Sequence, residues 1–185
     1  LKTLGGDGLR IVRSRVGDDI RVAKQFGVLI PVPCVPGEIV QVVVNLLVNA
    51  IHATGDTGRV QVSSWQDKHE VWICIEDNGY GVPRDVITRI FDPFFTTKGV
   101  EAGTGLGLSM VDSFATQLGG GLRIQSTVGL GTIVTIPIHP VRSEAGTPIE
   151  KTNAQQRPSV PQTAKTVHVG EDKARIRTIT VSNIV

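Results

Sequence analysis

The sequence predicts an α/β fold, a two-layer sandwich in which a mixed β-sheet packs against three helices. Three observations lead to this expectation. There is a long apolar segment with polar residues every four positions, there are two pairs of apolar segments joined by short turns, and a glycine-rich loop runs into a second apolar helix. In chain order the elements read helix, two strands, helix, loop, helix and two strands, which suggests two packed layers.

The first predicted helix covers residues 38–53, EIVQVVVNLLVNAIHA. Its β-branched residues are typical of strands, but Gln41, Asn45 and Asn49 recur every four residues and form one polar stripe on an otherwise apolar helix. Pro36 just ahead is tolerated in a first turn. A helix this apolar is buried, and a buried amide without a partner costs on the order of 1–3 kcal/mol. We therefore expect the asparagines to line a site or to satisfy buried backbone.

The other predicted elements form two hairpins and two helices. Residues 59–65 and 70–77 alternate apolar and polar side chains, which predicts an antiparallel hairpin. Asp77 ends the second of these strands. The remaining elements are a helix over 83–91 that Pro83 opens, a helix over 106–118 capped by the glycines at 119–121, and a final hairpin of 122–127 and 132–138.

The composition excludes several classes of protein. A formal net charge of +2 gives no indication of a nucleic acid as partner. No apolar run nears the roughly 20 residues that span a bilayer, and the first residues do not resemble a signal peptide, so we expect no membrane contact from this segment. Cys34 and Cys74 lack metal-ligand spacing. We interpret them as reduced core thiols of a cytoplasmic protein.

Composition divides the chain into four regions. Residues 1–19 hold four glycines and only a weak helical pattern, and residues 20–139 carry nearly every strong pattern. Residues 140–165 are rich in Pro, Ser, Thr and Gln, a composition that buries too little apolar surface to offset chain entropy, so we expect a flexible linker. Hydrophobic periodicity returns in residues 166–185.

The glycine-rich sequence GTGLGL (103–108) leads directly into a predicted helix. Free backbone N–H groups and the helix dipole would point at one spot there, and glycine lets the backbone approach a ligand closely, as phosphate binding requires. By itself such a loop is often only a tight turn. It is not a Walker loop, because no Gly-Lys-Ser/Thr follows.

Asp77 begins the sequence DNGYG at the end of a strand that should be central. Asp-Asn-Gly is common turn chemistry, but a buried carboxylate needs a donor, and the exocyclic amine of adenine would supply one. Asn45 and Asn49 offer neutral oxygens at four-residue spacing, which suits Mg²⁺ carried in with phosphates. Together with the glycine loop, these residues would make a base site, a metal site and a phosphate site.

Four segments resemble the boxes of two-component sensor histidine kinases. NLLVNA (45–50), DNGYG (77–81), FDPFFTTK (91–98) and GTGLGL (103–108) are similar to the asparagine, first glycine, phenylalanine and second glycine boxes, in the family's order. The resemblance covers about residues 20–139. It implies the Bergerat-type (GHKL) ATP-binding sandwich shared with DNA gyrase B, the MutL proteins and a heat-shock chaperone. The loop after Phe94-Phe95 would then be an ATP lid with a hinge at these phenylalanines.

The resemblance implies a role for each matching residue. Asn49 would coordinate Mg²⁺, Asn45 would assist toward the metal and the phosphates, and Asp77 would bind the adenine amine of ATP. Lys98 would offset phosphate charge from the lid, although a solvated lysine is an equal alternative. The other implied ATP-binding residues are Gly79 and Gly81 beneath the base, Gly103, Gly105, Leu106 and Gly107 at the phosphates, and Thr132 on the adenine side.

The same resemblance favours a kinase over a hydrolase. ATP-hydrolysing members of the superfamily place a glutamate one turn before the metal-binding asparagine, where this chain has Asn45, and an amide cannot act as a general base. The implied reaction is transfer of the γ-phosphoryl group of ATP to a histidine on a separate dimerisation domain. None of the four histidines here (His52, His69, His139 and His168) matches that acceptor. Two alternatives remain open: a non-catalytic nucleotide-binding or interaction module, and an anti-sigma-type serine kinase.

Both ends of the chain suggest a longer parent. Residues 166–179, TVHVGEDKARIRTI, resemble the opening of a response-regulator receiver domain, with a strand, an acidic pair and then a helix; a chance acidic pair before a helix is the alternative. Residues 166–185 would be the truncated start of that receiver in a hybrid kinase. Residues 1–19 would be a connector or the end of the dimerisation helices, and the parent a homodimer. Val35 departs from the family's capping Asp, which should cost about 1 kcal/mol.

Overall fold

The computed structural model describes residues 19–32, 34–67, 70–97, 103–118, 121–138, 166–168 and 177–182. Two α-helices and seven strands lie in these residues. In chain order they are β1 (Ile20–Phe26), α2 (Pro36–Thr54), β2 (Gly58–Asp67), β3 (Glu70–Asp77), α3 (Gly107–Gln117), β4 (Leu122–Thr127), β5 (Gly131–Ile138), β6 (Thr166–His168) and β7 (Arg177–Ser182).

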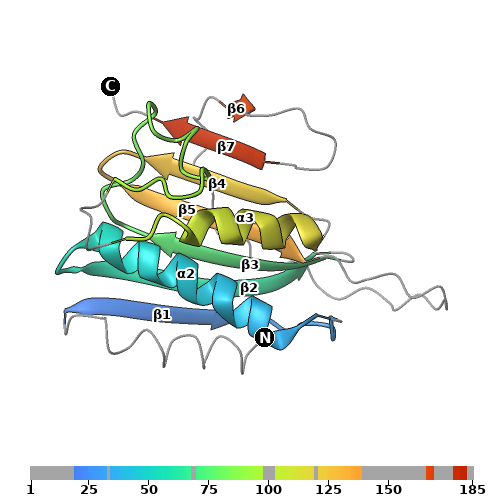
Figure 1. The fold of residues 1–185 in the computed structure, drawn as a ribbon. Coiled ribbons are helices and arrows are strands. Elements are labelled where there is room, and N and C mark those ends of the chain that lie inside the picture. Colours follow the sequence, from blue (N-terminus) through green and yellow to red (C-terminus); the bar gives the residue numbers. More distant parts are fainter. Residues whose placement is uncertain are drawn as a thin grey trace.

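The strands form one mixed sheet in the order β1-β2-β3-β5-β4-β7-β6. β1 pairs with β2, and β4 with β7, in parallel, while the other neighbours are antiparallel. Figure 1 shows α2 and α3 side by side across one face of this sheet. The predicted two-layer α/β sandwich with a mixed sheet is therefore confirmed.

The core lies between the helices and the sheet because each element has one apolar side. On β3, Val71, Ile73 and Ile75 are all buried, as the alternating pattern predicts. The helix α2 is buried along most of its length, and Leu47 at its centre has no exposed surface. The buried residues of α2 are Ile39, Val42, Val43, Leu46, Leu47, Ala50 and Ile51.

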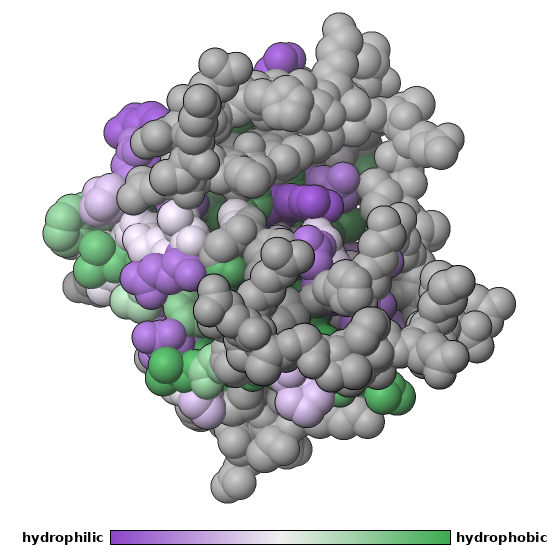
Figure 2. Space-filling model, turned by 90° about the vertical axis from the view of Figure 1, so that its right-hand side faces the viewer, coloured by the Kyte–Doolittle hydropathy of each residue, from purple (hydrophilic) through white to green (hydrophobic). Residues whose placement is uncertain are grey.

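The helix α2 is long and apolar enough to cross a membrane by length and composition alone. In this protein its apolar side packs against β2, β3 and α3, which explains its hydrophobicity as that of a core helix. On the side seen in Figure 2, the hydrophobic residues form small separate groups among hydrophilic ones rather than one continuous surface. Among the described residues, most of the large apolar side chains therefore lie inside the sandwich.

The helix ends agree with the sequence in part. Pro36 lies in the first turn of α2, and Val35 is its N-cap without a side-chain hydrogen bond, as expected from the missing capping residue. At the end of α3, the N–H of Leu118 donates to the carbonyl of Phe114. Gly121 adopts a positive φ of 70°, a conformation that favours glycine.

Three elements differ from the prediction. Residues 84–91 form successive turns instead of the helix expected over 83–91, with N–H groups of Val86 and Ile87 both donating to Pro83. The strand β1 was not predicted. Residues 177–182 form a strand beside β4, where the receiver resemblance predicts a helix after the acidic pair at 171–172, which itself lies outside the described residues. The domain boundaries stay predictions.

Both cysteines are free, as predicted. Cys74 is buried on β3, on the side of the sheet that faces away from the helices, because it alternates with Ile73 and Ile75, which belong to the core beneath the helices. Burial raises the pKa of the Cys74 thiol, while hydrogen bonds with Thr135 and Ser63 oppose that rise and Glu76 adds to it. The thiol is therefore protonated and unreactive at neutral pH.

Candidate functional site

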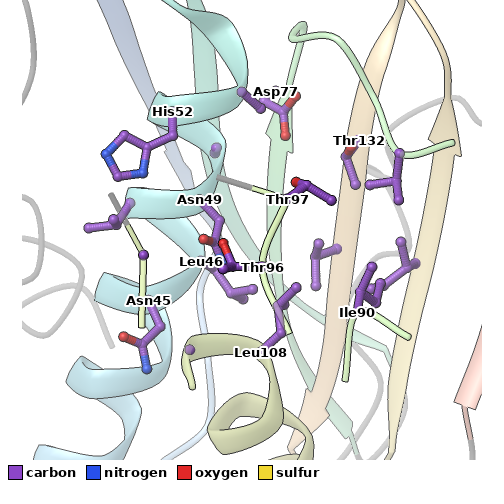
Figure 3. A pocket seen from close by; sticks show the side chains of 18 of the residues that line it. Asn45, Leu46, Asn49, His52, Asp77, Ile90, Thr96, Thr97, Leu108 and Thr132 are labelled. Atoms are coloured by element: carbon purple, nitrogen blue, oxygen red, sulfur yellow. The ribbon is translucent and has the colours of Figure 1, made fainter. Parts of the chain in front are cut away.

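A pocket of about 1200 Å³ lies between α2, the end of β3, the turns over 80–90 and the start of α3. In Figure 3, Asn45, Asn49 and His52 lie on successive turns of α2, Asp77 lies nearest the His52 end, and Thr132 lies across from it. Of the sequence-predicted site residues, those that line the pocket are Asn45, Asn49, Asp77, Gly81, Gly103, Gly105, Gly107 and Thr132.

Asp77 is the carboxylate of this pocket and is only 8% exposed. Burial is the main reason that the pKa of Asp77 is raised to about 6. Hydrogen bonds from the backbone of Gly79 and Thr132 lower this pKa, and the nearby charge of Glu76 raises it further. The N–H of Gly79 donates to Oδ1 of Asp77 over 2.9 Å. No lysine or arginine is among the described residues that line the pocket. The carboxylate is therefore a buried acceptor suited to a neutral N–H donor rather than to a cation.

Three glycines bring the surrounding backbone against Asp77. A side chain at Gly79 would overlap the carbonyl of Ala53 on α2, and one at Gly131 would overlap the carbonyl of Asp77 itself. Gly81 has a positive φ of 70°, and a side chain there would overlap the carbonyl of Thr127. Gly79 is not among the residues that line the pocket. Its observed contacts orient the Asp77 carboxylate and let α2 approach β3, and its predicted place beneath a base stays a prediction.

Ser126 on β4 organises the same end of the pocket and has no sequence motif that could have revealed it. Its Oγ accepts the N–H of Val82 over 2.8 Å and lies 3.2 Å from the carbonyl oxygen of Gly131, to which it donates. It also lies 3.0 Å from the Oγ1 of Thr132. This network fixes the Thr132 hydroxyl opposite Asp77, its cross-strand partner.

The far end of the pocket combines amides with a helix N-terminus. Gly107, the first residue of α3, lies close to the side chain of Asn49. A β-carbon added to Gly107 would be in van der Waals contact with Nδ2 of Asn49, at 3.8 Å. The N-cap residue Leu106 makes no side-chain capping bond, so the first-turn N–H groups are not capped by it. Leu106 itself is not among the pocket-lining residues. Its predicted role, to bring backbone to the phosphates between Gly105 and Gly107, stays a prediction.

Asn45 also lines the pocket, and its amide already has partners. Its Oδ1 accepts a hydrogen bond of 3.3 Å from Gln41, and its Nδ2 lies 3.5 Å from the sulfur of Met110 on α3. The side chain therefore links α2 to the start of α3. A neutral amide at this position can orient a ligand but cannot take up a proton.

The two ends of the loop that precedes α3 are tied together. The N–H of Phe94 donates to the carbonyl of Gly105 over 3.0 Å. Both residues have positive φ angles, of 66° and 67°, and a side chain on Gly105 would overlap the backbone of Phe94. Arg89 lies 4.5 Å above the ring of Phe95. Lys98 lies outside the described residues, so its predicted role stays a prediction.

The donors of this pocket fit a hard cation that arrives with a ligand. No group of three or more His, Cys, Asp or Glu side chains within the described ranges could hold a metal ion. The amide oxygen of Asn49 is a neutral oxygen donor beside the N-terminus of α3, where phosphate oxygens would lie. Mg²⁺ commonly takes few protein ligands and completes its shell with phosphates and water, so the residues present fit Mg²⁺ and not a transition metal.

Comparisons with known proteins agree with this geometry. The pattern of the family described as histidine kinase-, DNA gyrase B- and HSP90-like ATPase matches residues 34–142. The chain is 41% identical to the sensor kinase CckA of Brucella abortus over 145 residues, 69% of this chain and 15% of that protein. It is 40% identical to the sensor histidine kinase ZraS of Salmonella typhimurium over 102 residues, 55% of this chain and 22% of that protein.

Solved structures show the same relationship. The catalytic domain of the histidine kinase ThkA superposes with a TM-score of 0.67 at 27% identity, covering 76% of this chain and 92% of that domain. The mycobacterial sensor histidine kinase MprB gives a TM-score of 0.63 at 27% identity, covering 76% of this chain and 95% of that chain. The chain spans only a small part of its full-length curated relatives but nearly all of these structures. It belongs to the histidine kinase-, DNA gyrase B- and HSP90-like ATPase family, as a catalytic domain of the sensor histidine kinase type.

Proposed function

We propose that this domain binds ATP with Mg²⁺ and positions the γ-phosphoryl group for transfer to a histidine supplied by another domain. The observation that carries the proposal is the pairing of a buried acceptor, Asp77, at one end of the pocket with an uncapped helix N-terminus beside Asn49 at the other. A purine with an exocyclic amine fits the first end, and phosphates fit the second.

Each end has a defined task in this proposal. Asp77 accepts a hydrogen bond from the adenine amine, with Thr132 held beside it by Ser126. The N–H groups at the start of α3 hold the phosphates, the amide oxygen of Asn49 holds the Mg²⁺ that the phosphates carry, and Asn45 assists toward both. Bound Mg²⁺ would neutralise charge on the phosphate oxygens. In the transfer, the bond between the bridging oxygen and the γ-phosphorus breaks, a bond from that phosphorus to a histidine nitrogen forms, and ADP leaves.

Transfer is favoured over hydrolysis by the residue one turn before Asn49. Asn45 stands there, and its amide contacts Gln41 and Met110. Because an amide cannot accept a proton from water in a general-base step, activation of water at this position is excluded. The acceptor is proposed to be a histidine of a dimerisation domain, in a homodimeric cytoplasmic parent that passes the phosphoryl group to a response-regulator receiver domain.

Nucleotide binding should depend on the carboxylate of Asp77. Replacing it by Asn keeps its shape but presents an amide to the adenine amine, so Asp77→Asn should weaken ADP binding by at least about 10- to 100-fold. Isothermal calorimetry with Mg²⁺ measures this. Asp92→Asn, which changes an exposed carboxylate, is the matched control and should bind as the unmodified chain does. Equal binding by Asp77→Asn and the unmodified chain would contradict the proposal.

The same substitution should stabilise the fold, with a definite pH dependence. The pKa of Asp77 rises from an ordinary 3.8 to about 6 on folding. The free energy of unfolding therefore falls as the pH rises from about 4 to 6, and it stays at the lower value above that pH. Asp77→Asn removes this loss and should gain up to about 3 kcal/mol at pH 7, and far less at about pH 4. Urea unfolding at both pH values tests this. A gain independent of pH would show that desolvation of the charge is not the cause.

The amide of Asn49 should couple nucleotide binding to Mg²⁺. In the unmodified chain, ADP should bind more tightly when Mg²⁺ is added. For Asn49→Ala we expect this enhancement to disappear, while binding measured in excess chelator changes little. Calorimetry with and without Mg²⁺ gives the comparison. If Asn49→Ala keeps the full Mg²⁺ enhancement, the metal is held elsewhere.

Phosphoryl transfer should require a second domain. We expect no labelling of this chain by γ-labelled ATP, and labelling of a separately produced histidine-bearing dimerisation domain of the CckA relative once this chain is added. Phosphohistidine is recognised because the label is lost in acid and kept in alkali. An acid-stable label on serine would favour a serine kinase instead, and nucleotide binding without any transfer would favour a non-catalytic module.

A further inference from the structure

Tyr80 is the sole tyrosine of the chain and lies three residues after Asp77. It lines the pocket, yet its surface is 53% exposed. The family resemblance assigns roles to Gly79 and Gly81 on either side of it and none to Tyr80. An aromatic ring that is exposed at a pocket wall is the kind of surface that a ligand covers.

The backbone of Tyr80 is held firmly on both sides. Its N–H donates to the carbonyl of Ala53 on α2 over 3.1 Å, and its carbonyl accepts the N–H of Gly129, in the turn between β4 and β5, over 2.9 Å. The neighbouring glycines pack too closely for side chains at either position. The ring therefore starts from a fixed point beside the carboxylate, while the ring itself is not buried.

Among the described residues that line the pocket, Tyr80 is the phenylalanine, tyrosine or tryptophan that follows Asp77 at its end of the pocket. Near this end the pocket is lined by aliphatic side chains of the sheet and of the turn after Tyr80, namely Ile75, Val82, Ile124 and Val134. Phe95, which also lines the pocket, belongs to the loop that precedes α3, and in Figure 3 the ring of His52 on α2 points away from Asp77. Aliphatic side chains can cover one face of a planar purine, and a second face stays available for stacking.

We infer that Tyr80 is a positioning residue for the nucleoside half of the ligand, its ring packing against the base held by Asp77. This inference rests on the proposed function. The ring, not the hydroxyl, makes the contact, since aromatic stacking depends on the π face. Tyr80→Ala should therefore weaken ADP binding about 3- to 10-fold, and Tyr80→Phe should restore it.

The experiment combines calorimetry with a spectroscopic reading of the ring. Because Tyr80 is the only tyrosine, labelling the full chain with ¹³C-tyrosine gives one set of ring signals. We expect these to shift on addition of ADP with Mg²⁺, through the ring current of adenine, and to stay in place with Mg²⁺ and inorganic pyrophosphate at saturating concentration. Leu130→Ala, at a residue that is 60% exposed and outside the pocket lining, is the control and should bind ADP normally.

The outcomes separate this inference from the proposed function. If the unmodified chain binds ADP but the ring signals do not move and Tyr80→Ala binds equally well, Tyr80 has no role and the nucleotide site stands. If pyrophosphate shifts the ring as ADP does, the contact is with phosphates and the inference is wrong. If the unmodified chain binds no nucleotide, the proposed function fails and the inference fails with it. Thermal unfolding of each variant confirms that the fold is unchanged.

Discussion

The site depends on the close convergence of three backbone segments around Asp77, where no side chain can be accommodated between them. Gly79 lets α2 approach the end of β3, and Gly131 lets the start of β5 lie against the carbonyl of Asp77. A β-carbon at either position would push the helix or the hairpin away. Because the carboxylate is buried by this convergence, its position, its desolvation and its hydrogen bond with Gly79 all follow from one packing arrangement.

That arrangement prepares the site for a ligand at a cost in folding stability. A carboxylate surrounded by apolar strands and lacking a cation has a raised pKa, so the charged form destabilises the native state. The adenine amine of the proposed ligand would add a further donor to the backbone N–H groups of Gly79 and Thr132 that the protein supplies. Local destabilisation of this kind is common where a site is preorganised for a partner. The apolar core beneath, with Leu47 and Ile75 fully buried, supplies the stability that tolerates it.

Segments in which apolar and polar residues alternate with a clear helix or strand period predicted the sandwich and most of the residues that line the pocket. The stripe of Asn45 and Asn49 on α2 was visible because helical periodicity separates polar from apolar positions. Ser126 could not be found this way, since a serine on a strand resembles any other strand residue until its partners are known. The strand β1, IRVAKQF, has no clear alternation and is held by pairing with β2. Residues 84–91 have apolar residues at helical spacing, but tertiary contacts leave them as turns.

The hydrogen bond between Phe94 and Gly105 has a consequence for how the family can diversify. It brings the two ends of the intervening segment, residues 95–104, to one point on the scaffold. Closing a loop between fixed ends becomes only about 0.6 kcal/mol less favourable for each doubling of its length. Insertions or deletions between these anchors would therefore leave in place the walls that α2, β3 and β5 contribute, while the part lined by residues 95–97 and 103–104 would change. The segment can change in length and composition independently of the fold, so relatives can present different side chains there while the positions of Asp77 and of the N-terminus of α3 are kept.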